Sequence, residues 1–339
     1  MLKPGLTYGS DQSGLIWGYV FEPDKAAVSI SSAQAADWLQ AMRAHGSDQF
    51  IWLHFNLSNT ASEKWIAEHT GVVDEFYEAL HEGSRSTRIE LAENTLIAVI
   101  NDVLHNFSFQ PSDTSTVWIS LSEHVVISVR RTPLKSIERL RGAVEGGEPI
   151  RSTVELLIHL LRDQADVLVS IVRDAVAKVD EIEDNLLAGR LNQRRAKLGV
   201  LRRVLVRLQR LLAPEPAALF RLLQRPPRWV VDEDRQELRQ STEEFSVVLS
   251  DLMSIQERIK LLQEEIAASV NEGNNRSLFV LTIVTVLALP INIITGLLGM
   301  NVGGIPLSGH DQGFWVVVAI VVTITVVAGW LALRAQRDR

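Results

Sequence analysis

The sequence contains no cysteine among its 339 residues. The chain can therefore form neither disulfide bonds nor thiolate metal sites, and this composition suits a reducing, cytosolic environment for the bulk of the protein. An excess of basic residues is missing too, since 34 Lys and Arg stand against 41 Asp and Glu, a formal net charge of −7. A nucleic-acid partner is therefore not expected.

Short motifs that carry a catalytic mechanism are also absent. The sequence has no Walker phosphate loop, no GxGxxG, no GxSxG and no HExxH. No enzymatic reaction is therefore predicted. Residues 1–14, MLKPGLTYGSDQSG, lack the basic and then apolar pattern that is typical of a signal peptide. The long apolar runs of this sequence lie near its C-terminal end instead.

Residues 278–300 and 314–333 are runs of 23 and 20 residues without a charged side chain. A helix of about 20 apolar residues crosses a hydrocarbon core of about 30 Å, so both runs are predicted transmembrane helices. The loop between them, residues 301–313, contains no Lys or Arg, whereas Arg276 precedes the first run and Arg334 follows the second. The positive-inside rule then predicts an external loop and cytoplasmic termini, including the tail at 334–339.

The first run carries its polar and small residues on one helical face. They recur at steps of three and four, with Leu289 between them: Thr282, Thr285, Asn292, Gly296 and Gly299; Leu278 continues the spacing backward. One interpretation is close helix packing in the membrane, which small and hydroxyl residues permit. The other is a water-filled pore. Asn292, close after Pro290, favours the pore, because an amide and an interrupted backbone at membrane depth usually border water or protein.

The same spacing continues backward through Asn275, Asn271 and Glu264. The helix face that carries these residues lies almost opposite an apolar seam. The seam consists of residues at alternating steps of four and three: Val248, Leu252, Ile255, Ile259, Leu262 and Ile266. An amphipathic helix with one buried side and one wet side would explain this segment alone. Its continuity with the membrane run predicts one helix over about 241–299, roughly 88 Å long, with a shared polar face.

Upstream of this helix the sequence predicts two further regions. Residues 1–140 alternate strand-like and helical segments, which indicates a cytosolic α+β domain with a mixed sheet; five strands are expected at 15–21, 50–56, 95–103, 116–122 and 124–130. Residues 150–230 read as a helical hairpin followed by a short helix, and 232–277 as the stalk part of the long helix. Acidic residues near the end of the first hairpin arm are expected to attract the arginines of the second arm.

The run PINIITGLLGMN, residues 290–301, resembles the signature of the CorA family of divalent metal-ion transporters. The family's Gly-Met-Asn corresponds to Gly299, Met300 and Asn301. The next residues, VGGIPL at 302–307, look like the loop of the ZntB zinc-transport branch and depart from the Met-Pro-Glu loop of magnesium-type members. The resemblance implies a funnel-shaped homopentamer in a bacterial inner membrane, with five first spans around the pore and the second spans facing lipid.

The resemblance also implies roles for single residues. Asn301 would form the external selectivity filter with Gly299 and Met300 and hold the hydrated ion. Leu289 and Asn292 would form inner constrictions, Asn275 would lie near the cytoplasmic mouth, and Glu264 would supply negative charge. The acidic pair that senses magnesium in the family is not evident, because Gln240 stands at one of its positions.

The resemblance makes Zn²⁺ the expected cargo, with Mg²⁺, Co²⁺, Ni²⁺ and Cd²⁺ as alternatives and no tightly bound cofactor. Neither span contains a histidine, and His310 of the outer loop is a weak candidate ligand. The zinc assignment therefore rests on the branch resemblance and not on ligand chemistry. Two alternatives stay open: a magnesium-type channel, and a membrane-anchored sensor in which the α+β domain does the work.

Overall fold

The computed structural model describes residues 9–23, 25–83, 87–110, 112–187, 194–300 and 311–337. They divide into two compact units, Met1–Gln263 and Glu264–Arg339. The first unit contains a mixed α/β domain and the start of a long helix; the second contains the rest of that helix and a C-terminal apolar helix. This agrees with the predicted α+β domain, long helix and apolar C-terminal helices, while the funnel-shaped homopentamer stays a prediction. The finer sequence-based division at 140, 150, 230 and 277 stays a prediction.

The α/β domain is built on a seven-stranded sheet of order β2-β1-β3-β7-β6-β5-β4. The strands are β1 Leu15–Phe21, β2 Val28–Ile30, β3 Phe50–Asn56, β4 Arg88–Ala92, β5 Thr95–Val103, β6 Thr114–Leu121 and β7 Val125–Arg130. Strands β3 and β7 are parallel and the other neighbours antiparallel. The five strands predicted from the sequence are the five inner ones.

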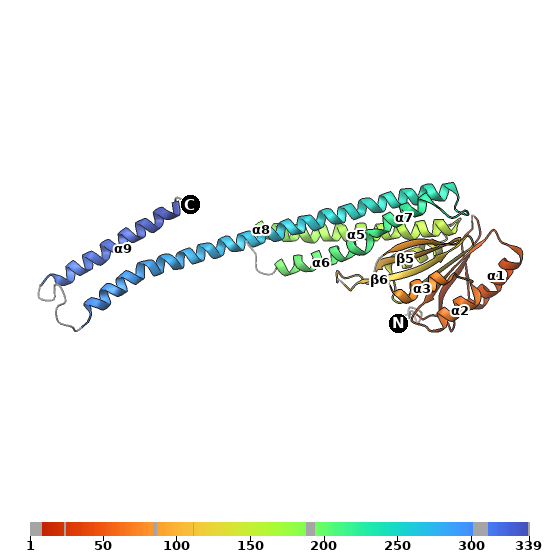
Figure 1. Cartoon of the computed structure of the whole chain (residues 1–339), viewed down its shortest axis with the longest axis horizontal. Helices are drawn as coiled ribbons and strands as arrows, with labels where there is room; N and C mark the ends of the chain where they lie inside the picture. The colour runs from red at the N-terminus through yellow and green to blue at the C-terminus, as the bar shows by residue number, and fades with distance from the viewer. Residues whose placement is uncertain are drawn as a thin grey trace. The chain divides into compact units, whose positions relative to one another are not determined.

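Helices cover both faces of this sheet (Figure 1). One face packs against α1 Ser32–His45, α2 Ala61–His69 and α3 Asp74–Glu82; the other packs against α4 Lys135–Glu145, α5 Thr153–Leu187 and α7 Pro214–Gln224. Successive strand residues point to opposite faces. In β3, Ile51 and Leu53 therefore join the core under α1 to α3, while Trp52 joins the core under α4 and α5.

The long helix predicted from the sequence is α8, Asp232–Leu298, which passes Gly273 and Pro290 without a break. In the first unit its apolar seam is buried except for the half-buried Ile255, and Leu252 and Ile259 are fully buried. Its side chain Leu238 belongs to the core of the α/β domain. Burial of such side chains contributes about 1.5–3 kcal/mol each, so this end of α8 is part of the domain core.

Polar contacts fix α8 beside the hairpin of α5 and α6 Arg194–Leu212. The Arg258 Nη1 atom of α8 lies 2.7 Å from the carboxylate of Asp180, and Arg258 also pairs with Glu183 near the end of α5. Arg202 of α6 donates a 3.0 Å hydrogen bond to Gln263 of α8. The acidic end of α5 thus pairs with α8, a partner that no pattern within the hairpin indicates.

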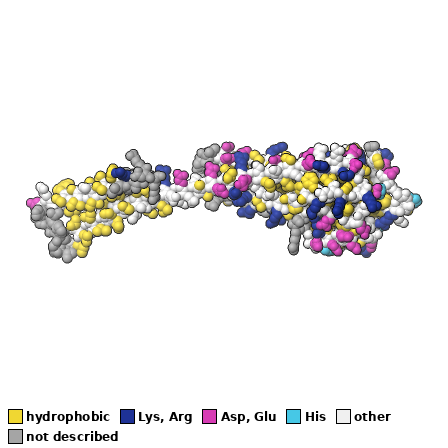
Figure 2. Space-filling view, turned by 45° about the horizontal axis from the view of Figure 1, so that its top comes forward, with side chains coloured by type: hydrophobic (Ala, Val, Ile, Leu, Met, Phe, Trp, Pro, Cys, Tyr) yellow, Lys and Arg dark blue, Asp and Glu magenta, His cyan; other side chains and the backbone are white. Residues whose placement is uncertain are grey.

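The second unit contains the apolar part of α8 and helix α9, Gly313–Arg337. Among the described residues, these two helices are long and apolar enough to cross a membrane. Figure 2 shows hydrophobic side chains dominating the visible face of this unit, while charged side chains gather on the first unit. The two predicted spans, 278–300 and 314–333, correspond to these two helices.

A buried carboxyl group in the first unit creates a pH-dependent term in stability. Glu215 of α7 is fully buried, and its Oε2 accepts a 3.3 Å hydrogen bond from Gln164 of α5. Burial, reinforced by the nearby Asp102, raises the pKa of Glu215 well above its usual value, and burial raises the pKa of Asp102 to about 6. Glu215 is therefore protonated in the folded state at pH values where the unfolded chain has lost that proton.

We predict that Glu215→Gln stabilises the protein increasingly as the pH rises. Folding of the wild type takes up a proton at Glu215, so its free energy of unfolding falls as the pH rises above the unfolded pKa, by up to about 1.4 kcal/mol per pH unit. In the variant, the neutral glutamine at position 215 still places a polar group beside Gln164, but folding takes up no proton there. Thermal unfolding of the full chain in detergent, followed by tryptophan fluorescence, measures the difference at pH 5 and pH 8.

The matched control is Glu78→Gln, because Glu78 is exposed on α3. Its effect on the melting temperature should be small and the same at both pH values. A Glu215→Gln effect that does not change with pH would contradict a protonated Glu215 in the folded protein.

Candidate functional site

Nine positions of α8 in the second unit form one row along the helix: Glu264, Asn271, Asn275, Leu278, Thr282, Thr285, Leu289, Asn292 and Gly296. At about 100° per residue they fall within an arc of roughly 100°. All nine are exposed in the single chain, and even Leu278 and Leu289 are 60% and 58% accessible. We call this row the polar face of α8. The nine positions share one face because α8 is a single unbroken helix over this range.

The two threonines of the polar face have satisfied hydroxyl hydrogens. Thr282 donates to the carbonyl of Leu278 at 2.8 Å, and Thr285 donates to that of Leu281 at 2.9 Å. Each hydroxyl hydrogen is thus directed at the helix backbone, while the oxygen keeps lone pairs that can accept. An acceptor of this kind suits the water molecules around a cation, whose hydrogens point outward.

The side-chain amides of the polar face, unlike the threonines, are not hydrogen-bonded to the backbone of their own helix in the described ranges. In the described ranges, the side chains of Asn271, Asn275 and Asn292 make no hydrogen bond. Asn292 lies in the apolar part of α8, where an amide without a partner costs free energy in hydrocarbon. It needs water or a group from another molecule.

Glycine residues near the end of α8 differ in what they permit. A Cβ on Gly299 would lie 3.0 Å from the carbonyl oxygen of Thr295, so a larger residue at this position would need the helix end to shift by a few tenths of an ångström. A Cβ on Gly296 would meet nothing within 4 Å. The fold of the single chain therefore does not require glycine at 296. Met300 follows with half of its surface exposed.

Two of the predicted site residues, Asn301 and His310, lie outside the described residues, as does most of the predicted loop at 301–313. The structure therefore gives no geometry for the filter residue or for the weak ligand candidate. Within the described ranges, no group of three or more His, Cys, Asp or Glu side chains is placed to hold a metal ion. Glu264 is thus not part of such a cluster in one chain.

A close serine–histidine pair, which no local sequence motif indicates, lies in the sheet. The Nδ1 atom of His54 is 2.7 Å from the Ser128 hydroxyl, and Arg130 donates to His54 Nε2 at 2.9 Å. Burial, together with Arg130 and Arg141, lowers the pKa of His54 well below its usual value. Ser128 lines a cavity of only about 10 Å³, about the volume of one water-sized probe. The pair is a packed structural element without room for a substrate.

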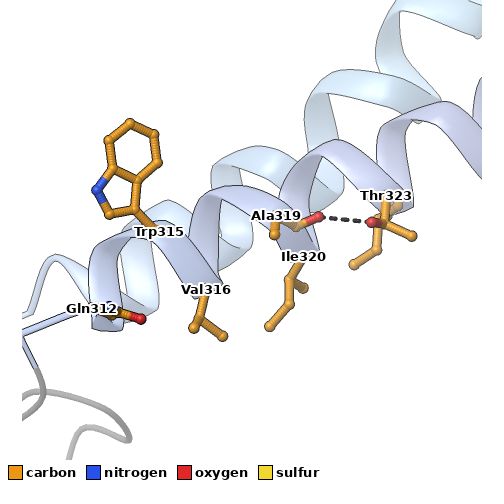
Figure 3. Close-up of a pocket in the computed structure, with 7 residues that line it drawn as sticks. Gln312, Trp315, Val316, Ala319, Ile320 and Thr323 are labelled. Atoms are coloured by element: carbon orange, nitrogen blue, oxygen red, sulfur yellow. Dashed lines mark hydrogen bonds between the residues drawn. The ribbon is translucent and has the colours of Figure 1, made fainter.

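The surface of α9 offers an apolar depression of about 500 Å³, in which Gln312 is the polar end (Figure 3). Trp315, Val316, Ala319 and Ile320 continue it along the helix, and the hydroxyl of Thr323 is bonded to the Ala319 carbonyl at 2.8 Å. Apart from Gln312, which directly precedes α9, the lining residues all belong to this one helix. A shallow apolar surface of this kind fits lipid or another helix better than a polar ligand.

Comparison with known proteins adds to this geometry. Residues 47–334 match the family described as "CorA-like Mg2+ transporter protein". The divalent cation transporter CmaX of Pseudomonas aeruginosa is 28% identical over 332 residues, covering 96% of this chain and 97% of that protein. The zinc transport protein ZntB of Pectobacterium carotovorum is 26% identical over 287 residues, covering 84% and 87%.

Solved structures agree over nearly the whole chain. Full-length CmaX superposes with a TM-score of 0.80 at 26% identity, covering 97% of this chain and 99% of that one. The CorA magnesium transporter of Methanocaldococcus jannaschii superposes with a TM-score of 0.74 at 21% identity, covering 93% and 96%, which bears on the fold alone. The family resemblance predicted from the Gly-Met-Asn sequence is confirmed: this chain belongs to the CorA-like family of transporters.

Proposed function

We propose that the protein passes hydrated divalent cations across a membrane, along the polar face of α8. One observation carries this proposal: a membrane-length apolar helix bears a row of exposed polar groups, and its amide at Asn292 has no partner within the described chain. A helix that only anchors a domain gains nothing from such a row. A ring of these helices around water would hydrate every one of these groups.

The proposed pore is formed by five copies of the chain, as the family resemblance implies. Open space around Gly296 is compatible with a neighbouring helix or with water at that position. In the ring, the amides of Asn301 would bind the water shell of the ion at the external end, next to Gly299 and Met300. Glu264 would raise the local concentration of cations at the other end. The membrane would be a bacterial inner membrane with both termini in the cytoplasm.

Zinc is the cargo that we propose, because the loop VGGIPL resembles the ZntB branch and a ZntB protein is among the relatives. Magnesium is the second candidate, favoured by the description of the family. The polar face supplies amide and hydroxyl oxygens with one carboxylate, and no imidazole or thiolate. Since dehydrated zinc prefers nitrogen and sulfur ligands, passage with its water shell fits these residues better than direct ligation.

The polar face can be tested by single cysteines, since the chain has none of its own. Glu264→Cys, Asn275→Cys, Thr285→Cys and Asn292→Cys should each cross-link between subunits or be blocked by a permeating thiol-reactive cation. Leu262→Cys and Ile283→Cys should not, because these positions lie off the polar face. Reaction at the off-face positions instead of the four would show that the pore face is misassigned.

We predict that Asn301→Ala abolishes cation flux and leaves the oligomer assembled, because methyl groups cannot hold the water shell of an ion. Liposomes with an entrapped zinc dye or magnesium dye measure the flux, and size exclusion in detergent measures assembly. The wild type should pass zinc faster than magnesium. Wild-type flux in Asn301→Ala would contradict the filter role, and faster magnesium flux in the wild type would favour the second candidate.

A further inference from the structure

A cavity of about 350 Å³ lies in the first unit, where the loop between β5 and β6 meets helices α5 and α6. It is lined by Phe109, Lys178, Glu181, Ile182, Lys197, Val200 and Leu201. None of these residues belongs to the polar face of α8. The volume is within the range of pockets that hold small organic molecules.

The aromatic wall of this cavity is held in an unusual backbone conformation. Phe109 has φ of +61°, a region that non-glycine residues rarely adopt. The carboxylate of Asp113 maintains the loop, because it accepts hydrogen bonds from Ser108 N at 2.7 Å and Gln110 N at 3.0 Å, on either side of Phe109. Burial alone would raise the pKa of Asp113, but these donors lower it below its usual value. Strained residues of this kind are typical of ligand sites.

Two lysines supply positive charge to the cavity. The Nζ atom of Lys178 lies 3.1 Å from the centre of the Phe109 ring. Burial lowers the pKa of Lys178 from its usual value, although the charge of Asp174 opposes this shift. In the part of the chain that the structure describes, neither Lys178 nor Lys197 forms a salt bridge. Among the residues that line the cavity, two lysines and one glutamate, Glu181, give a formal charge of +1, and Asp174 adds a negative charge near Lys178.

The floor of the cavity is apolar. Ile182 and Leu201 are 6% and 5% exposed, and Val200 lies beside them on α6. An apolar floor, an aromatic wall and a net positive charge are the features of a pocket for an amphiphilic anion. The aromatic ring is already engaged by Lys178, so the acidic group of a ligand would meet the lysines while its apolar body covers the floor.

We propose that this cavity binds a small organic anion that carries one acidic group on an aromatic or aliphatic body. The proposal is independent of the ion pathway, since it uses other residues and another unit of the chain. Sulfonate, carboxylate and phosphate groups share the required charge. Naphthalene-1-sulfonate is a suitable probe, and 1-naphthalenemethanol is its neutral counterpart with the same ring system.

The test uses the full chain in detergent with a single cysteine, Val200→Cys, at the floor of the cavity. Naphthalene-1-sulfonate should slow alkylation by N-ethylmaleimide by a factor of 1 + [L]/Kd, about tenfold at ten times Kd. The neutral alcohol should protect much less. The matched control is Val206→Cys, because Val206 is 43% exposed on the same helix and does not line the cavity.

The pair of substitutions Lys178→Gln and Lys197→Gln should abolish protection by the sulfonate. Calorimetric titration of the cysteine-free chain and of this double variant with the sulfonate gives the same comparison without relying on reactivity at position 200. Alkylation of Val206→Cys in the double-variant background checks that the fold is kept. Absence of binding, equal protection by the neutral alcohol, or undiminished binding to the double variant would each overturn the proposal.

Discussion

The lack of water inside a bilayer is the constraint on which the second unit depends. A helix in hydrocarbon satisfies its own backbone, but the amide of a side chain such as Asn292 stays unsatisfied unless water or another molecule reaches it. The hydroxyl groups of Thr282 and Thr285 are satisfied within the helix, because they donate hydrogen bonds to the carbonyls of Leu278 and Leu281. The amides do not, so α8 alone is an incomplete structure. This incompleteness is the physical basis for placing it around an aqueous path.

The first unit gives α8 a fixed beginning. Leu238 is part of the sheet core, Leu252 and Ile259 are buried, and Arg258 reaches the acidic end of α5. Exposed ion pairs contribute little individually, typically up to about 1 kcal/mol. The apolar seam is therefore the main attachment, and the charged contacts mainly select which side of α8 faces the hairpin. Both the polar side and the apolar side of α8 arise from residues that recur at steps of three and four in the sequence.

The sequence alone predicted the features that depend on local periodicity. The inner strands and the unbroken α8 follow from alternation and from three-four spacing, and the family follows from Gly299, Met300 and Asn301. The edge strands β2 and β4 were missed, since they are short and partly exposed. Contacts between distant segments were missed for a different reason: no local pattern pairs Arg258 with Asp180 or places the ring of Phe109 under Lys178.

If one side of α8 faces the ion path, two adjacent glutamates must differ in their effect on ion flux, and this difference is the most direct test. Glu264 is on the polar face and Glu265 lies about 100° around the helix, and both are exposed. Glu264→Gln and Glu265→Gln remove the same charge, so their zinc flux in liposomes can be compared at low ionic strength. We predict a several-fold loss of flux for Glu264→Gln that shrinks in about 1 M salt, and near wild-type flux for Glu265→Gln. Equal effects, or a loss only at Glu265, would contradict it.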